Sequence, residues 1–63
     1  MARYRIYFID SRGRMRLGEA FDCEDEDQAH AALARAERTE LETAELWRGG
    51  RLLRRLAPGK SGV

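Results

Sequence analysis

The single cysteine and the single histidine are the residues that could act as a nucleophile and a base. Cys23 and His30 stand seven residues apart, close to the start of the one helix-like stretch of the chain. A helix N-terminus can activate a thiol by favouring the thiolate. The four consecutive acids from Glu24 to Asp27 act in the opposite direction, and no oxyanion-hole motif or orienting third group is visible. We therefore interpret Cys23 as a half-buried structural residue and His30 as a residue of the helix surface.

Two further motifs fail at specific residues. A calcium loop of the EF-hand type that began at Asp22 would need glycine at its sixth position and glutamate at its twelfth, where the chain has Asp27 and Leu33. The segment Gly59-Lys60-Ser61 matches the end of a phosphate-binding loop, but Arg54 replaces the glycine required five residues earlier. We therefore expect no catalytic site, no metal site and no cofactor, and we do not expect an enzyme.

The arginines are the residues that most clearly suggest a binding function. Basic residues interleaved with aromatic residues on a sheet allow single-strand nucleic-acid binders to contact phosphates and stack bases. However, the net charge is only +1 and the pI is about 8.0, below the value above about 9 typical of such domains. The alternative is that the arginine stems cover apolar sheet area and pair with acids. The candidate contacts to an anionic partner are Arg5, Arg48, Arg51, Arg54 and Arg55.

Charge is divided into three blocks along the chain. Residues 1–21 carry five arginines against two acids, residues 22–45 carry nine acids against two arginines, and residues 46–63 carry five basic residues and no acid. The acidic block includes the helix-like stretch, whereas the basic blocks include the strand-like stretches. If the acidic helix lies on one face of the sheet, it repels phosphate from that face.

Length and composition limit the architecture. A chain of 63 residues is one domain at most, and its core is marginal unless it is stabilised by disulfides, a metal, regular packing or a second copy. The single cysteine excludes an internal disulfide and fits a reducing compartment. No apolar run approaches the length of about 20 residues that a membrane span needs. We therefore expect a soluble cytoplasmic protein that does not associate with membranes.

The first 21 residues predict a β-hairpin. Tyr4–Ile9 is rich in β-branched and aromatic residues, and Asp10-Ser11-Arg12-Gly13 is a turn signature. Met15–Phe21 is the expected return strand. The register that follows places Ile9 opposite Met15, Tyr7 opposite Leu17 and Arg5 opposite Glu19.

The middle of the chain predicts a helix from Glu26 to about Arg38. Asp25 and Gln28 have the spacing of a capping box, and the surrounding acids suit the positive end of a helix dipole. One apolar stripe at helical spacing follows, formed by Ala29, Ala32, Leu33 and Ala36. Because this stripe is mostly alanine, the helix can lie close to a sheet.

The segment Thr43–Leu56 predicts a second hairpin. Gly49-Gly50 separates Thr43–Arg48 from Arg51–Leu56 and fits a two-residue type I′ turn. The expected cross-strand pairs are Arg48 with Arg51, Trp47 with Leu52, Leu46 with Leu53 and Glu45 with Arg54. The whole chain is therefore expected to be an α+β protein of ββαββ order, with a four-stranded, mainly antiparallel sheet from two hairpins and one helix on one face. Residues 1–57 would form a single domain, and residues 58–63 a flexible C-terminal tail.

The strands are apolar on both faces, which one alanine-rich helix cannot cover. The face without the helix, or an edge of the sheet, is therefore expected to bind a partner. A second copy of the chain is the simplest partner, because twofold homodimers dominate soluble oligomers. The alternative is a monomer with a few exposed large side chains. The candidate interface residues are Tyr7, Ile9, Trp47, Leu52 and Leu56.

Three stretches of the chain resemble a group of short, uncharacterised bacterial ββαββ proteins. They are Tyr4-Arg5-Ile6-Tyr7-Phe8-Ile9-Asp10 with Gly13, Phe21 before the acidic helix start, and Ala44-Glu45-Leu46-Trp47 followed by Gly49-Gly50-Arg51-Leu52. The group has no assigned activity, so the resemblance implies a fold and no functional residue. The strand–strand–helix opening is also loosely similar to HicB-like antitoxins, which usually have a third strand before the helix.

Two hypotheses about function follow from the sequence. The first is a small non-enzymatic protein-interaction module that associates with itself through the helix-free face or an edge of its sheet. The second is a nucleic-acid-binding module, regulatory or antitoxin-like, that uses the arginines on its strands.

Overall fold

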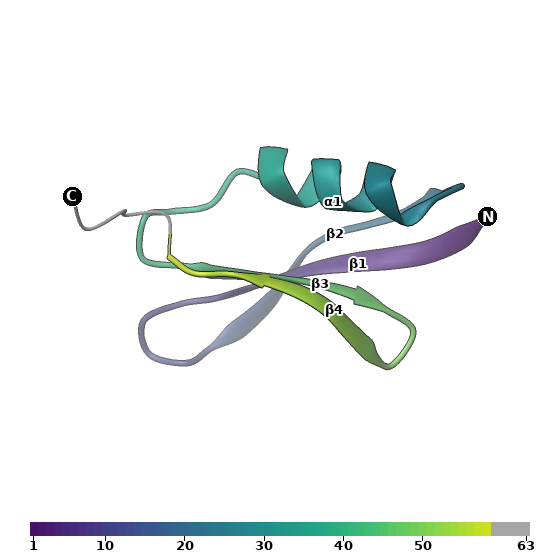
Figure 1. Ribbon diagram of the computed structural model, residues 1–63. Helices are drawn as coiled ribbons and strands as arrows, with labels where there is room; N and C mark the ends of the chain where they lie inside the picture. Colours follow the sequence, from purple (N-terminus) through teal and green to yellow (C-terminus); the bar gives the residue numbers. More distant parts are fainter. Residues whose placement is uncertain (59–63) are drawn as a thin grey trace.

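Each half of the chain forms one β-hairpin, and a helix connects the two. The computed structural model describes residues 1–58, in the order β1 (Ala2–Ile9), β2 (Met15–Cys23), α1 (Glu26–Arg35), β3 (Thr43–Arg48) and β4 (Arg51–Leu56). All neighbouring strands pair antiparallel in one sheet of order β2-β1-β3-β4. The helix lies across one face of this sheet, and both hairpin turns lie on the opposite side (Figure 1). The predicted α+β fold of ββαββ order is confirmed. The predicted tail, apart from Pro58, lies outside the described residues.

The first turn is held by the side chain of Asp10. Its Oδ1 accepts hydrogen bonds from the backbone N–H groups of Arg12 and Arg14, both at 2.9 Å. Gly13 follows with φ 85°, a left-handed conformation that glycine adopts without strain. The hydrogen bond from the backbone of Arg14 is the main cause that lowers the pKa of Asp10. The turn is therefore stabilised by an ionised aspartate.

The second turn differs from the predicted type. A type I′ turn needs positive φ at both central residues, but only Gly49 has it, at 61°. A positive φ at the first central position alone is the pattern of a type II′ turn. The position of the turn and the two strand ranges are as predicted, because either turn type matches the twist of the strands.

The helix begins as predicted and ends earlier. Oδ1 of Asp25 accepts a hydrogen bond from the backbone N–H of Gln28 at 2.9 Å, which caps the first turn. The helix ends at Arg35, because Ala36 has an extended backbone with φ −64° and ψ 134°. The residues that would continue the helix form hydrogen bonds with residues outside it. Arg38 donates to the carbonyl oxygen of Ala57 at 2.9 Å, and the N–H of Thr39 donates to Glu42 at 3.0 Å.

The core lies between the helix and the two central strands. Its buried side chains come from β1, β3 and one stripe of α1, and they are Tyr4, Ile6, Phe8, Ala44, Leu46, Ala29 and Leu33. Ala32 and Ala36 complete the predicted stripe as partly buried residues. This set is small, as expected for a chain of 63 residues.

A bulge at Gly18 changes the register of the first hairpin. Tyr7 pairs with Leu17 as predicted, but Ile6 pairs with Glu19, so that Gly18 is an extra residue in β2. The predicted pair of Arg5 with Glu19 is therefore wrong. Odd-numbered residues of β2 lie on the helix-free face before the bulge and on the helix side after it. As a result Phe21 lies on the helix side, where its ring stacks on Tyr4 with centroids 6.0 Å apart.

A second bulge, at Leu53, has the same effect on β4. Trp47 pairs with Leu52 as predicted, but Leu46 pairs with Arg54 and Glu45 with Arg55. The predicted pairs of Leu46 with Leu53 and of Glu45 with Arg54 are therefore wrong. Leu56 pairs with Ala44 and packs against the core, so its predicted place beside Trp47 on the helix-free face is also wrong.

Candidate functional site

The face of the sheet opposite the helix presents a continuous apolar surface. Tyr7 and Ile9 of β1 alternate with the buried core residues of that strand and therefore point away from the helix. Met15 and Leu17 are 53% and 54% exposed, and Leu52 is 41% exposed. We call this surface the open patch, and it consists of Tyr7, Ile9, Met15, Leu17, Trp47 and Leu52.

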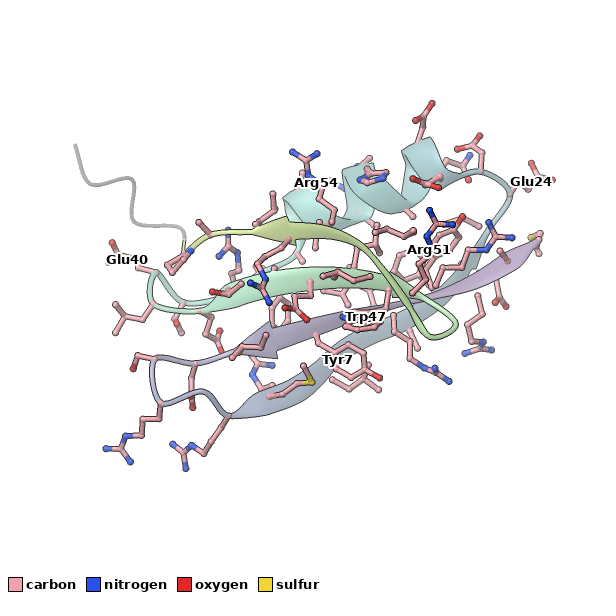
Figure 2. The ribbon with its side chains drawn as sticks, turned by 60° about the horizontal axis from the view of Figure 1, so that its bottom comes forward. Tyr7, Glu24, Glu40, Trp47, Arg51 and Arg54 are labelled. Carbon is pink, nitrogen blue, oxygen red and sulfur yellow. The ribbon has the colours of Figure 1, made fainter. Side chains whose placement is uncertain are left out.

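Two aromatic rings form the centre of the open patch. Tyr7 and Trp47 lie side by side on the central strands, and their rings meet edge to face with centroids 6.5 Å apart and an interplanar angle of 89° (Figure 2). They border a shallow depression of about 340 Å³ that is also lined by Met15, Gly49 and Gly50. Rings packed in this way are held in place and present rigid apolar area.

A buried carboxylate lies next to these rings. Glu45 points to the helix-free face, opposite Tyr7 in the sheet, but only 2% of it is exposed. Its Oε1 accepts the indole N–H of Trp47 at 3.0 Å, and its Oε2 accepts Nε and Nη2 of Arg55 at 2.9 and 2.7 Å. Both oxygens therefore have partners, and the negative charge is balanced within the chain. The sequence predicted that Glu45 faces Arg54, whereas the bulge places Arg55 there, and it did not predict that Glu45 would be buried.

Four of the five predicted interface residues lie on the same face of the sheet. Tyr7, Ile9, Trp47 and Leu52 share the helix-free face, whereas Leu56 lies on the helix side. Whether these residues contact a partner remains a prediction.

The predicted anion-binding arginines are divided between the two faces. Arg5 and Arg55 lie on the helix-free face, and Arg55 is engaged by Glu45. Arg48, Arg51 and Arg54 lie on the helix side, because they pair with or oppose residues that face the helix. The five arginines therefore do not form one surface.

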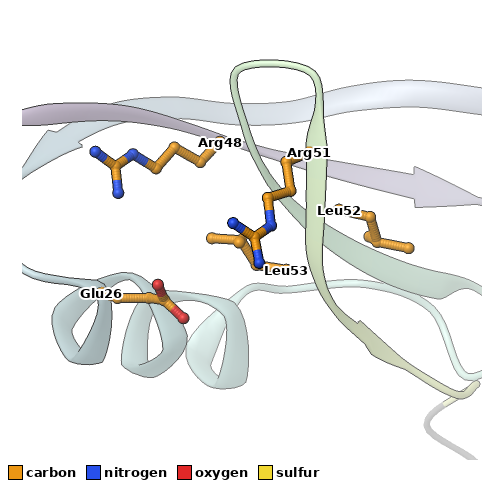
Figure 3. A pocket seen from close by; sticks show the side chains of 5 residues that line it. All are labelled: Glu26, Arg48, Arg51, Leu52 and Leu53. Atoms are coloured by element: carbon orange, nitrogen blue, oxygen red, sulfur yellow. The ribbon is translucent and has the colours of Figure 1, made fainter.

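Two of the helix-side arginines line a depression at the start of the helix. It measures about 340 Å³ and is bounded by Glu26, Arg48, Arg51, Leu52 and Leu53. The Arg51 guanidinium and the Glu26 carboxylate face one another across it (Figure 3). The Arg48 guanidinium lies 6.0 Å from the centre of the Tyr4 ring, a distance that allows a cation–π interaction.

A second ion-pair network connects β2 with the loop before β3. Glu42 is buried and accepts Nε and Nη2 of Arg16 at 3.1 Å each, in a bidentate pair. Its carbonyl oxygen also accepts a hydrogen bond from Arg38. The hydrogen bonds from Arg16, followed by that from the backbone of Thr39, lower the pKa of Glu42. This network joins β2 to the loop before β3 and is structural.

The cysteine and the histidine are not brought into a catalytic arrangement. Cys23 is half-buried at the end of β2 and packs against the core, whereas Nε2 of His30 lies 3.0 Å from Glu26. Residues 1–58 contain no cluster of three or more potential metal ligands. In the same part of the chain, no helix is long and apolar enough to cross a membrane.

No family model, curated protein or solved structure matches the chain.

Proposed function

We propose that the chain is a non-enzymatic protein-interaction module that forms a homodimer through the open patch. The observation that carries this proposal is a sheet face with three large apolar side chains between 41% and 54% exposed, grouped around two aromatic rings. Apolar patches of this kind usually mark an interaction surface. The aromatic pair at the centre is the type of residue that contributes most binding energy in interfaces.

The size of the face fits a dimer of ordinary proportions. The molecule measures 36 × 23 × 16 Å, so the sheet face covers about 830 Å² in projection. A standard specific interface buries about 800 Å² on each partner. Nearly the whole helix-free face would therefore have to be covered, which favours a broad sheet-on-sheet contact over a contact limited to one edge.

The buried carboxylate of this face does not oppose a second copy, whereas Arg5, opposite Trp47, adds a positive charge to the face. Two identical faces repel one another when each presents an unpaired charge at its centre. Glu45, the central charged group here, is already bound by Arg55 and Trp47. Two open patches can therefore meet without leaving an unpaired carboxylate buried between them.

The test compares the mass in solution of matched variants. We expect wild type to show twice the monomer mass of 7.2 kDa by light scattering at high micromolar concentration. Leu17→Glu places a charge in the open patch and should give the monomer mass. Leu41→Glu is the control, because Leu41 is 61% exposed in the loop before β3 and outside the patch. A wild-type mass of one chain at these concentrations would refute the proposal.

A nucleic-acid-binding module, regulatory or antitoxin-like, is the second candidate. The supporting observation is that Tyr7 and Trp47 lie on an open sheet face that also carries Arg5. Bases can stack on aromatic rings of a sheet while arginines contact phosphates. The buried Glu45 under the same rings disfavours this reading. Salt-dependent binding of a labelled single-stranded oligonucleotide that Arg5→Glu abolishes would support it, and no binding at low salt would exclude it.

A further inference from the structure

Arg48 and Arg51 form a like-charged pair within the sheet. They are directly opposite one another in the β3–β4 ladder, on either side of the Gly49-Gly50 turn. Like charges in this relation destabilise a hairpin. Within the described residues, neither arginine has a carboxylate within 4.0 Å, although ion pairs are present for Arg3, Arg14, Arg16 and Arg55. An anion placed between the two guanidinium groups would relieve this repulsion.

The surroundings of the pair form a groove. The Arg51 side chain reaches across Leu53 toward the helix, and Glu26 forms the opposite wall (Figure 3). Leu53, the bulge residue of β4, is partly buried and provides an apolar floor. The groove therefore combines two cations with an apolar surface, which suits a ligand that has both anionic and apolar groups.

The acids at the helix start limit the length of an anionic ligand. Glu24, Asp25, Glu26 and Asp27 follow one another at the end of α1 that borders the groove. A nucleic-acid strand needs a basic path along several successive phosphates. Because these acids interrupt such a path, the groove can accept one or two anionic groups but not a polyanion.

The neighbouring strand favours a peptide as the carrier of these groups. β4 is the last strand of the sheet, so one side of its backbone has no strand partner among the described residues. An extended peptide can add to such an edge through main-chain hydrogen bonds. Alternate side chains of the added strand would point to the helix side, where Arg51 and Arg54 lie.

We propose that the groove between the start of α1 and the β3–β4 hairpin binds an extended peptide with acidic side chains at alternate positions. One carboxylate binds Arg51, the next approaches Arg54, and the peptide backbone follows the free edge of β4. Glu26 competes with the ligand for Arg51. The arginines of the site lie on the helix side, and Leu52 is the one residue that the groove shares with the open patch.

The test uses a fluorescein-labelled peptide of five residues in which two glutamates alternate with three valines, measured by anisotropy at low salt. We expect Arg51→Gln to weaken binding about tenfold or more, as expected for loss of a charge-assisted hydrogen bond. Arg12→Gln is the matched control, because it removes the same charge from the turn of the other hairpin and should leave affinity unchanged. Glu26→Gln should raise the affinity, because it removes the competing carboxylate. Circular dichroism checks that each variant is folded.

Three outcomes would overturn the proposal. The first is no binding of the peptide by wild type at 50 mM salt. The second is equal loss of affinity in Arg51→Gln and Arg12→Gln, which would indicate attraction by net charge only. The third is tighter binding of a labelled oligothymidine through Arg51, which would assign the groove to phosphates. A peptide N-methylated at its valines should bind weakly, and unchanged binding would contradict the addition to the edge of β4.

Discussion

Among the described glycines, Gly18 is the one at which an added side chain would collide with the core. A Cβ atom at this position would lie 2.1 Å from Cε2 and 2.7 Å from Cδ2 of Phe8. Phe8 is buried in the core, so its ring cannot move aside freely. We expect Gly18→Ala to lower the free energy of unfolding by about 1–3 kcal/mol, as overpacking does in other cores. Urea denaturation measures this change.

Gly50 provides the control for this variant. It also lies at a hairpin, but a Cβ atom there would meet nothing within 4 Å, and its φ is not positive. Gly50→Ala should therefore leave the free energy of unfolding nearly unchanged. If the two alanine variants were equally stable, the close packing of Phe8 on the bulge would be wrong.

Glu42 makes the stability of the fold sensitive to acid. Because Arg16 and Thr39 lower its pKa in the folded state, its ionised form is favoured by folding. The resulting stabilisation is fully present above the pKa of an unfolded glutamate, about 4.3, and is lost as the pH falls through the folded value. We expect the melting temperature of wild type to fall over this acidic range.

The variant Glu42→Gln tests the assignment. It removes the titrating group, so its melting temperature should be lower at neutral pH and should fall less steeply with acid than that of wild type. Asp10 also has a lowered pKa and leaves a residual slope in the variant. Parallel pH profiles for wild type and variant would show that Glu42 does not contribute.

At the scale of the elements, the cap of the single helix can be tested directly. Asp25 accepts the N–H of Gln28, a group that has no other partner within the first turn. Asp25→Ala should therefore cost about 1 kcal/mol of unfolding free energy, the usual value for loss of an N-cap. Asp27→Ala removes the same charge from the first turn without removing the cap and should cost less. Thermal denaturation of both variants compares them, and equal losses would exclude the capping role.

Local sequence patterns were sufficient to predict most of the elements. The β3 and β4 ranges, the helix start at Glu26 and the apolar helix stripe agree with the structure. These features depend on residues close together in the chain, such as Asp25 with Gln28 or the Gly49-Gly50 turn. The early end of the helix depends on Arg38 contacting Ala57, nineteen residues away, and no local pattern contains that information.

The bulges explain most of the errors in the predicted sheet. Strict alternation along an outer strand predicts that Phe21 shares a face of the sheet with Met15, and that Leu56 shares a face with Leu52. In each pair the two residues are an even number of positions apart. One extra residue in each outer strand moves the residues beyond the bulge to the opposite face of the sheet. Gly18 was a detectable signal for the first bulge, since an isolated glycine within a strand often marks one. Leu53 has no such mark, so the second bulge follows only from the packing of β4 against the core.

The candidate site was only partly predictable for the same reason. Four of the five proposed interface residues share the helix-free face, and these are Tyr7, Ile9, Trp47 and Leu52. Tyr7, Ile9 and Trp47 belong to the two central strands, which run without an internal bulge. The carboxylate of Glu45 is bound by Trp47 of its own strand and Arg55 of the neighbouring strand, and this arrangement requires the tertiary structure.

At the scale of the whole molecule, a small core and a wide uncovered face predict that stability depends on concentration. If the native form is a dimer, unfolding and dissociation are coupled, and the melting temperature rises with protein concentration. We expect a shift of several degrees for an increase of about hundredfold, followed by circular dichroism. Leu17→Glu should remove the dependence without unfolding the chain, because Leu17 is 54% exposed in the monomer. A melting temperature independent of concentration in wild type would argue against the dimer.

The two bulges also bear on how this fold can evolve. Removing Gly18 or Leu53 from the ladder would make the pairing on either side regular, and every other residue of the strand would keep its face. A one-codon deletion of Gly18 is therefore a small change, whereas deletion of Leu53 also removes a side chain packed against the core. A deletion elsewhere in an outer strand would exchange core and surface residues. Among descendants of a common ancestor with this architecture, differences in strand length should accumulate at these two positions, and the central strands should keep a constant length.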